Sequence, residues 1–238
     1  RNFTIRYSSN IPHLVGLAGS SAIITACMRA LMAFYGVTIP KTQLANLILS
    51  VETEELQISA GLQDRVAQTY QGLVYMDFDE SLMRKQGYGC YEELDVSLIS
   101  NIYIAYRTNL AQISGVFHSD MRHRFRKRDR DVLDAIEAWK ELTTTARNMI
   151  TNGEAEKLAP LLDANFDHRA ALGGVSDGNM ELVRLARSAG VSAKLTGSGG
   201  AIVGTYENEQ MFQKLKETMT TNEIEVLKPN IASALKES

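Results

Sequence analysis

The chain has 238 residues, and its 25 Lys and Arg against 28 Asp and Glu give a formal net charge of −3. This length accommodates one or two domains, and 45% hydrophobic with 22% charged residues is ordinary soluble composition, which argues against a general nucleic-acid binder. Cys27 and Cys90 have no CxxC spacing, which argues against a disulfide scaffold and a zinc site and favours the reducing cytoplasm. No apolar run reaches about 18 residues, which argues against a membrane span.

Strand and helix signals alternate along the first part of the chain. Phe3, Ile5 and Tyr7 alternate with polar residues, which predicts a half-buried strand that leads into a glycine loop. The apolar run Ser20–Phe34 then predicts a core helix, buried almost all round and closed by Gly36. Two further helices and a strand are expected at 41–56, 62–70 and 73–78.

The weakest periodicity, over residues 86–100, predicts a linker or boundary, with domains at 1–98 and 99–238. Beyond it, strands and helices continue without a repeated period, which favours an α+β chain in two lobes. Strands are expected at 102–106, 193–195, 201–206 and 225–227, and helices at 130–151, 154–172, 177–190 and 207–220.

A glycine loop, Pro12–Ala22, precedes the predicted core helix, with Gly16, Gly19, Ser20 and Ser21 at the mouth of the helix. A helix N-terminus offers unpaired N–H groups and partial positive charge, so this segment predicts phosphate or nucleotide binding. Alternatively, one of the serines caps the helix and the glycines form a turn. The Walker pattern GxxxxGK[ST] is absent, which excludes an ordinary P-loop.

A second glycine loop, Lys194–Ala201, lies between two short apolar strands. A plain hairpin turn is one interpretation of this loop, because hairpins favour glycine-rich connections. A two-residue turn would suffice for that purpose. Four small residues beside Thr196 therefore indicate close packing against a ligand or against the first glycine loop.

Glu52 is placed unusually for a charged residue. Leu44, Ile48 and Leu56 lie at helical spacing from it, so a helix would direct its carboxylate along an apolar stripe. A buried carboxylate needs a cation, which would be a Lys or Arg in a structural ion pair or a metal such as Mg²⁺.

A second carboxylate, Asp64, follows the glycine break at Gly61 and precedes Arg65. It would serve either as a helix N-cap or as a group that orients and deprotonates a substrate hydroxyl, kept ionised by the adjacent cation.

The run from His118 to Arg130 carries six fixed positive charges interleaved with acids. An exposed helix face is the simplest interpretation of such a pattern. Some of these arginines would instead bind a carboxylate or phosphate in bidentate fashion, or the run would contact RNA in a salt-dependent way.

In order along the chain, the two loops with Glu52 and Asp64 between them resemble the GHMP small-molecule kinases. The family's second motif, near PxxxGLGSSAA, is similar to Pro12–Ala22, and its third, near KxTGSGGGG, is similar to Lys194–Ala201 up to Ala201. Within the family, further stretches look most like plant-type glucuronokinases, ATP-dependent sugar 1-kinases. They are Ala60–Gln68, Gly72–Phe78, His118–Ser119 with Arg122 and Arg124, and Asn165–Asp167.

The resemblance implies a two-lobed GHMP kinase fold, with a ribosomal S5-like N-terminal lobe and a ferredoxin-like C-terminal lobe, and ATP and Mg²⁺ as cofactors. It implies that the ATP phosphates are bound by Gly16, Leu17, Ala18, Gly19, Ser20, Ser21 and Ala22. It implies that Mg²⁺ is held by Glu52 with either Ser20 or Ser21. The catalytic group would be Asp64. The expected substrate-binding residues are Asp64, Arg65, Thr196, Gly197, Ser198, Gly199, Gly200, Arg122 and Arg124.

The substrate expected from the resemblance is a small sugar, D-glucuronate first of all, with no nucleic-acid or membrane partner. A GHMP kinase for a heptose, galactose or arabinose, or a non-catalytic ligand-binding relative, is the alternative. If the substrate is a uronic acid, its carboxylate should meet an arginine, with Arg65, Arg122 and Arg124 as candidates. The family's first motif, near PGRxxLxGEH, is not found, so we expect an N-terminal segment outside the numbered chain.

Overall fold

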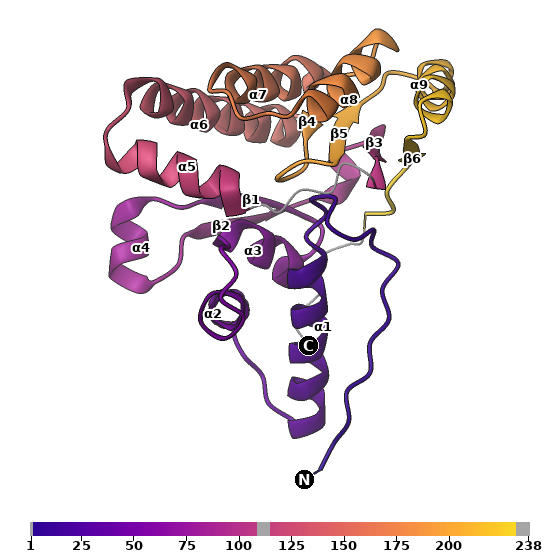
Figure 1. Ribbon diagram of the computed structural model, residues 1–238. Coiled ribbons are helices and arrows are strands. Elements are labelled where there is room, and N and C mark those ends of the chain that lie inside the picture. Colours follow the sequence, from indigo (N-terminus) through magenta and orange to yellow (C-terminus); the bar gives the residue numbers. More distant parts are fainter. Residues whose placement is uncertain (1, 109–114, 232–238) are drawn as a thin grey trace. The chain divides into compact units, whose positions relative to one another are not determined.

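The computed structural model describes residues 2–108 and 115–231, and in it the chain divides into two compact units. Unit 1 is built from residues 2–11 and 18–96, and unit 2 from residues 12–17 and 97–230. Both units mix helices with antiparallel strands, so the expected α+β class is confirmed (Figure 1). Among the described residues, no helix is both long and apolar enough to cross a membrane.

Unit 1 combines a helical layer with a two-stranded sheet. Its elements are α1 (Gly19–Tyr35), α2 (Lys41–Ser50), the π-helical turn η1 (Val51–Glu55), α3 (Leu62–Tyr70), β1 (Leu73–Asp77), α4 (Glu80–Gln86), β2 (Cys90–Leu94) and the 3₁₀ turn η2 (Val96–Leu98), which crosses into unit 2. Strands β1 and β2 are antiparallel, with Leu73 opposite Leu94. A small core forms where α2 and α3 meet this sheet, around Ala45, Val66 and Tyr70.

The predicted strand at residues 3–7 is wrong. Residues 2–10 are irregular, and none of the strands described in the structure pairs with them. A strand is stabilised by ladder hydrogen bonds to a neighbour, so an alternating pattern alone does not form one. Phe3 instead packs on helix α1, with its ring centroid 5.6 Å from Phe34 and 6.2 Å from Tyr35.

Helix α1 forms where the apolar run predicted a helix, and it ends at Gly36, whose φ of 66° is left-handed. Its burial was predicted wrongly. Its buried residues are Ser21 and Thr25, whereas Phe34 and Tyr35 are exposed. Within unit 1 this helix contacts α2 and α3. These two helices do not cover all of its apolar side chains.

The linker predicted over residues 86–100 is wrong in its middle, where β2 pairs with β1 along its whole length. Gly89 serves this pairing. A Cβ atom at Gly89 would collide with the carbonyl oxygen of Asp77, so close approach of the two backbones requires a glycine here.

Unit 2 is a four-stranded antiparallel sheet, in the order β4-β5-β3-β6, with helices on it. Its strands are β3 (Ile102–Tyr106), β4 (Lys194–Leu195), β5 (Ala201–Thr205) and β6 (Glu225–Leu227). Its helices are α5 (Gly115–Arg126), α6 (Arg130–Thr151), the short η4 (Ala155–Lys157), α7 (Ala159–Ala171), α8 (Asp177–Ser188) and α9 (Glu209–Thr221). Figure 1 shows α6 and α7 lying side by side.

The register of this sheet separates its two faces. Ala105, Ile202 and Leu195 are aligned across three strands, and all three are buried in the core with residues of α7, α8 and α9. Because successive residues of a strand point to opposite faces, their neighbours occupy the second face. The residues aligned there, all half-buried, are Ile104, Val203 and Lys194.

Candidate functional site

The first glycine loop leads into α1 through left-handed backbone. Gly16 has a φ of 73°, and the N-cap residue, Ala18, has a φ of 54° and makes no side-chain hydrogen bond to the helix. Neither serine of this segment therefore caps the helix, which disagrees with the capping alternative. The first-turn N–H groups of α1 keep the partial positive charge that suits a phosphate.

The two serines have different partners. Ser20 Oγ donates to Glu52 Oε1 over 2.7 Å, whereas Ser21 Oγ donates to the Ala18 carbonyl oxygen over 2.9 Å. Only the Ser20 hydroxyl therefore lies beside the carboxylate. A hydroxyl and a carboxylate are hard oxygen donors, and this pair fits Mg²⁺, which takes few protein ligands besides phosphate oxygens and water.

Glu52 lies in the π-helical turn η1 and is fully buried, as its spacing in the sequence predicted. Its second oxygen, Oε2, accepts from both Nε and Nη2 of Arg65. This ion pair, in which two guanidinium nitrogens contact one carboxylate oxygen, compensates a carboxylate that would otherwise be costly to bury. Glu52 therefore makes both contacts at once: Oε2 forms the ion pair with Arg65, and Oε1 accepts the hydrogen bond from Ser20.

Arg65 is itself only 5% exposed, and Nη1 donates to the carbonyl of Gly61 over 2.9 Å and to Asp64 Oδ2 over 3.3 Å. Its guanidinium is thus neutralised by two carboxylates of the same unit. In this geometry Arg65 binds both Glu52 and Asp64, and its expected contact with a substrate carboxylate stays a prediction.

Asp64 is the third residue of α3, whose N-cap is Gly61, so the N-cap interpretation of Asp64 is wrong. Its side chain is 51% exposed while one oxygen faces the Arg65 guanidinium. Asp64 is therefore an accessible carboxylate held in place by a buried arginine.

In unit 2 the second glycine loop connects β4 to β5 and lies against Gly16. Thr196 Oγ1 donates to the Gly16 carbonyl over 2.9 Å, and a Cβ on Gly197 would lie 3.0 Å from that same oxygen. A Cβ on Gly16 would lie 2.9 Å from the carbonyl oxygen of Gly199. The structure thus brings the two loops into backbone contact, and glycine is needed at both sides of it.

Two side chains that the sequence analysis missed hold this loop. Arg169, on α7, donates to the carbonyls of Gly197 over 2.7 Å and Ser198 over 3.2 Å. The buried Asn179, on α8, accepts from the N–H of Gly200 over 2.8 Å. No motif surrounds either residue, so only the tertiary structure could reveal them.

Lys194 begins β4, directly before the glycine loop, and its Nζ donates to the Leu195 carbonyl over 2.9 Å. Burial, followed by repulsion from the Arg169 guanidinium, lowers the pKa of Lys194 to about 8. The sequence analysis included Lys194 in the motif but gave it no role.

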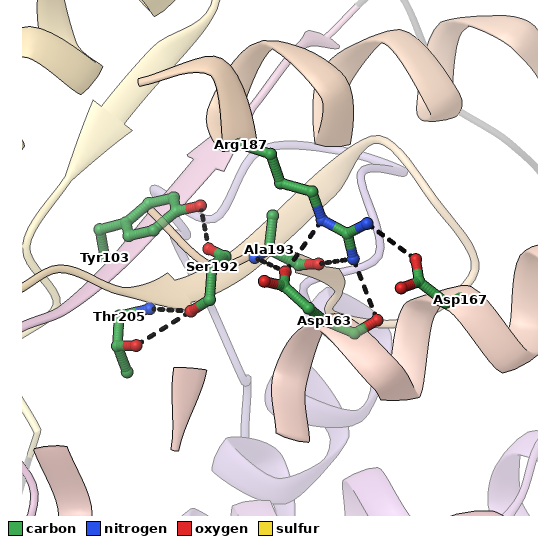
Figure 2. Close-up of polar contacts among 7 residues, drawn as sticks. All are labelled: Tyr103, Asp163, Asp167, Arg187, Ser192, Ala193 and Thr205. Atoms are coloured by element: carbon green, nitrogen blue, oxygen red, sulfur yellow. Dashed lines mark hydrogen bonds and ion pairs between the residues drawn. The ribbon is translucent and has the colours of Figure 1, made fainter. Parts of the chain in front are cut away.

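A polar network anchors the base of the glycine loop to α7 and α8 (Figure 2). Arg187 Nε binds Asp163 Oδ1 over 2.9 Å, and its Nη1 binds Asp167 over 2.7 Å. The same Asp163 oxygen accepts from the N–H of Ala193, just before β4. On β3, which is separated from β4 by β5, the hydroxyl of Tyr103 donates to the Ser192 carbonyl over 2.7 Å, and burial raises the pKa of this tyrosine.

The predicted basic run lies mostly on α5. Arg124 donates to Asp129 Oδ2 over 2.8 Å and to the Leu172 carbonyl over 2.9 Å, and the Asp129 hydrogen bond raises the pKa of Arg124. These contacts tie α5 to the start of α6 and the end of α7. Arg122 is exposed on the same helix. The side chains of His118 and Ser119 lie outside the described residues.

Comparison with known proteins supports the resemblance found in the motifs. Residues 1–72 match the family model described as the GHMP kinases N terminal domain. This segment is similar to the N-terminal domain of the GHMP kinases. The match spans the first glycine loop, Glu52 and Asp64, and the expected likeness to the GHMP kinases is confirmed.

Two curated GHMP relatives come from Arabidopsis thaliana. The chain is 41% identical to Glucuronokinase 1 over 207 residues and 41% identical to Probable glucuronokinase 2 over 209 residues. Each match covers 85% of this chain and 57% of the relative, so the chain spans a little over half of their length. A shorter match, 30% identical over 77 residues, covers 32% of this chain and 23% of D-glycero-alpha-D-manno-heptose 7-phosphate kinase from Campylobacter jejuni.

Solved structures confirm the GHMP kinase fold. Lactococcus lactis galactokinase complexed with galactose superposes with a TM-score of 0.71 at 17% identity, covering 96% of this chain and 69% of that one. Mevalonate kinase of L. major in complex with R-mevalonate gives a TM-score of 0.69 at 18% identity, covering 90% of this chain and 67% of that one. At these identities the likeness concerns the fold alone.

Proposed function

We propose that the protein transfers the γ-phosphoryl group of ATP to the anomeric hydroxyl of D-glucuronate, which yields glucuronate 1-phosphate and ADP. The observation that carries this proposal is the joined group of Ser20, Glu52, Arg65 and Asp64. It supplies a metal-binding pair and an accessible carboxylate through one continuous set of contacts. The identity to the two Arabidopsis glucuronokinases supports the choice of sugar.

The nucleotide side of the proposed site uses the backbone of the first glycine loop. Residues 16–22 would bind the ATP phosphates with N–H groups at the start of α1, where the helix dipole favours negative charge. Ser20 and Glu52 would hold Mg²⁺, because these two side chains place oxygens 2.7 Å apart. When bound, the ion would offset charge on the β- and γ-phosphates.

Asp64 acts on the acceptor in this proposal. Its free oxygen accepts a hydrogen bond from the anomeric hydroxyl, orients it toward the γ-phosphorus and takes its proton as the new P–O bond forms and the bond to ADP breaks. Arg65 contacts the other oxygen of Asp64 from the buried side and so helps to hold this side chain in place. Phosphoryl transfer depends mainly on positioning and charge neutralisation, so no covalent nucleophile is needed.

The same proposal assigns residues 1–98 to the later part of an N-terminal GHMP lobe and residues 99–238 to a C-terminal lobe. The second glycine loop, Thr196–Gly200, would support the phosphate loop and the substrate, as its contact with Gly16 favours. The protein would act in the cytoplasm on a free small sugar, without a nucleic-acid or membrane partner.

Release of ADP from the intact protein with MgATP tests this proposal. The acceptor panel should contain D-glucuronate, galactose, arabinose and a heptose 7-phosphate, the last because of the shorter heptose kinase match. We expect turnover to be fastest with glucuronate. Absence of turnover on every acceptor would overturn the kinase proposal, whereas preference for another sugar would overturn only the substrate.

A further inference from the structure

We propose that Asn179 is a positioning residue for nucleotide binding, which acts through the second glycine loop on Gly16 of the first. This inference rests on the proposed function and names a side chain outside both glycine loops on which the affinity for ATP depends. The contacts that carry it all lie within unit 2, to which residues 12–17 and 97–230 belong.

The side chain of Asn179 is held in one orientation by its own helix. It is 1% exposed and lies in the first turn of α8, where Nδ2 donates to the hydroxyl of the N-cap residue, Ser176, over 3.0 Å. With Nδ2 engaged in this way, Oδ1 faces the N–H of Gly200 and accepts from it over 2.8 Å. Asn179 therefore presents an acceptor of fixed position to the glycine loop.

The backbone of Gly199 lies between Asn179 and Gly16, and neither contact leaves room for a side chain. A Cβ added to Gly199 would lie 2.3 Å from Asn179 Nδ2. A Cβ added to Gly16 would lie 2.9 Å from the Gly199 carbonyl oxygen. Because closely packed atoms have little free volume in which to adjust, a change at Asn179 is passed to Gly16 across a single residue.

Gly16 is the point at which this chain of contacts reaches the proposed phosphate-binding segment. Its carbonyl accepts from Thr196 Oγ1 over 2.9 Å, which ties it to the loop a second time. Residues 16–22 would bind the ATP phosphates through N–H groups, and such hydrogen bonds weaken when donor and acceptor are misaligned. The proposed base, Asp64, has its partner Arg65 within unit 1, outside this chain of contacts. A displaced Gly16 therefore affects the nucleotide more than the acceptor sugar.

Asn179→Leu tests the proposal, because leucine keeps the γ-branched shape of asparagine but cannot accept from Gly200. The matched control is Ser192→Ala, which also removes a buried side-chain oxygen that accepts from a backbone N–H, that of Thr205, over 2.9 Å. Figure 2 shows Ser192 beside Tyr103 and Thr205, at the end of β5 away from the glycine loop. The KM values for ATP and glucuronate and the Kd for MgADP should be measured on the intact protein, with thermal melts to compare stability.

We expect Asn179→Leu to raise the KM for ATP and the Kd for MgADP by about tenfold, the effect of leaving one buried N–H without its acceptor. The KM for glucuronate should change by less than about twofold. Ser192→Ala should lower the melting temperature but leave both nucleotide constants unchanged. Equal rises in the two KM values, or a loss of stability with unchanged nucleotide constants in Asn179→Leu, would overturn the proposal.

Thr196→Val tests whether Asn179 acts through the loop. This change removes the hydroxyl that binds the Gly16 carbonyl, so it weakens the same contact from the other side. The double variant with Asn179→Leu should then raise the KM for ATP by less than the product of the two single effects. Effects that multiply would overturn the route through the loop.

Ser176→Ala is a milder variant for the case in which Asn179→Leu does not fold. It leaves Asn179 in place but removes the partner of Nδ2, so the amide is no longer held toward Gly200. We expect a rise of about threefold in the KM for ATP and the Kd for MgADP, in the range of a lost neutral hydrogen bond. Unchanged nucleotide constants in this variant would overturn the proposal.

Binding of MgADP separates failure of this inference from failure of the kinase proposal. If the wild type binds MgADP but phosphorylates no sugar, the proposed function fails, and Asn179 is judged from the Kd for MgADP alone. A weaker Kd in Asn179→Leu with an unchanged Kd in Ser192→Ala would then support the positioning role without any turnover. A wild type that binds no nucleotide would overturn both proposals.

Discussion

The hydroxyl of Ser20 donates to the carboxylate of Glu52 over 2.7 Å, which joins the first turn of α1 to a buried acid 32 residues later in the chain. The neighbouring Ser21 turns back to its own helix start. The motif alone left either serine as the metal ligand, and this geometry favours Ser20 in the proposed reaction.

Replacing each serine should therefore have unequal effects. We expect Ser20→Ala to lower kcat by about tenfold to a hundredfold and to raise the Mg²⁺ concentration needed for half-maximal rate, in line with other losses at metal sites. Ser21→Ala should cost less, because its hydroxyl bonds only a backbone carbonyl. Initial rates over a Mg²⁺ titration check both, and a larger defect in Ser21→Ala would contradict the assignment.

Asp64→Asn tests the proposed base. Loss of a general base that acts in the transition state typically costs about 10²- to 10⁴-fold, so we expect a fall of that size in kcat with little change in the KM for ATP. Glu80→Gln is the matched control, because it neutralises an exposed carboxylate at the start of α4. Steady-state kinetics on both variants decide the matter, and near wild-type activity in Asp64→Asn would return this residue to a structural role.

Gly16→Ala should disrupt the contact between the two loops. The added Cβ would lie 2.9 Å from the Gly199 carbonyl oxygen, in addition to the cost of about 1–2 kcal/mol for a side chain in the left-handed region. Gly36→Ala is the control, because its φ is similar but no atom lies within 4 Å of the new Cβ. Chemical denaturation should show a larger loss of stability for Gly16→Ala. Equal losses of stability in the two variants would mean that the contact between the loops adjusts to the added Cβ without a measurable cost.

Lys194 should make stability depend on pH between about 8 and its ordinary value of 10.5. Its pKa is lower in the folded protein, so in this window the unfolded chain binds more protons and stability rises with pH. The cost of the buried charge is fully present below pH 8. We therefore expect the free energy of unfolding of the wild type to increase relative to that of Lys194→Met as the pH is raised from 7 to 10. Denaturation of both proteins over this pH range measures the difference. A constant difference would show that the pKa is not lowered.

Local signals in the sequence predicted most elements of the fold. Helices α3 and α6 and strands β3 and β6 have the predicted bounds, because apolar periodicity and glycine breaks are written into neighbouring residues. The segment at residues 2–10 failed because a strand depends on a partner elsewhere in the chain. Sequence pattern can show that one side of a segment is apolar, but it cannot show what covers that side.

In the candidate site too, the sequence predicted features that depend on neighbouring residues and missed those that depend on distant ones. Glu52 was predicted to be buried from its own helical spacing, and the structure places it so. Arg169 and Asn179 were missed, because they contact the glycine loop across 28 and 21 residues of chain, respectively. The pairing of Arg65 with Glu52 likewise depends on tertiary structure, because the two residues lie 13 positions apart in the chain.

Helix α7 holds the second glycine loop at two points. Asp163 binds the N–H of Ala193 at the base of β4, and Arg169, fewer than about two turns further along the same helix, binds the carbonyls at the tip. A shift of α7 would therefore displace the loop at both of these points, against the hydrogen bond from Gly200 to Asn179 on α8. A mutation on the outer side of this helix would then alter where the loop meets its ligand while leaving every loop residue unchanged.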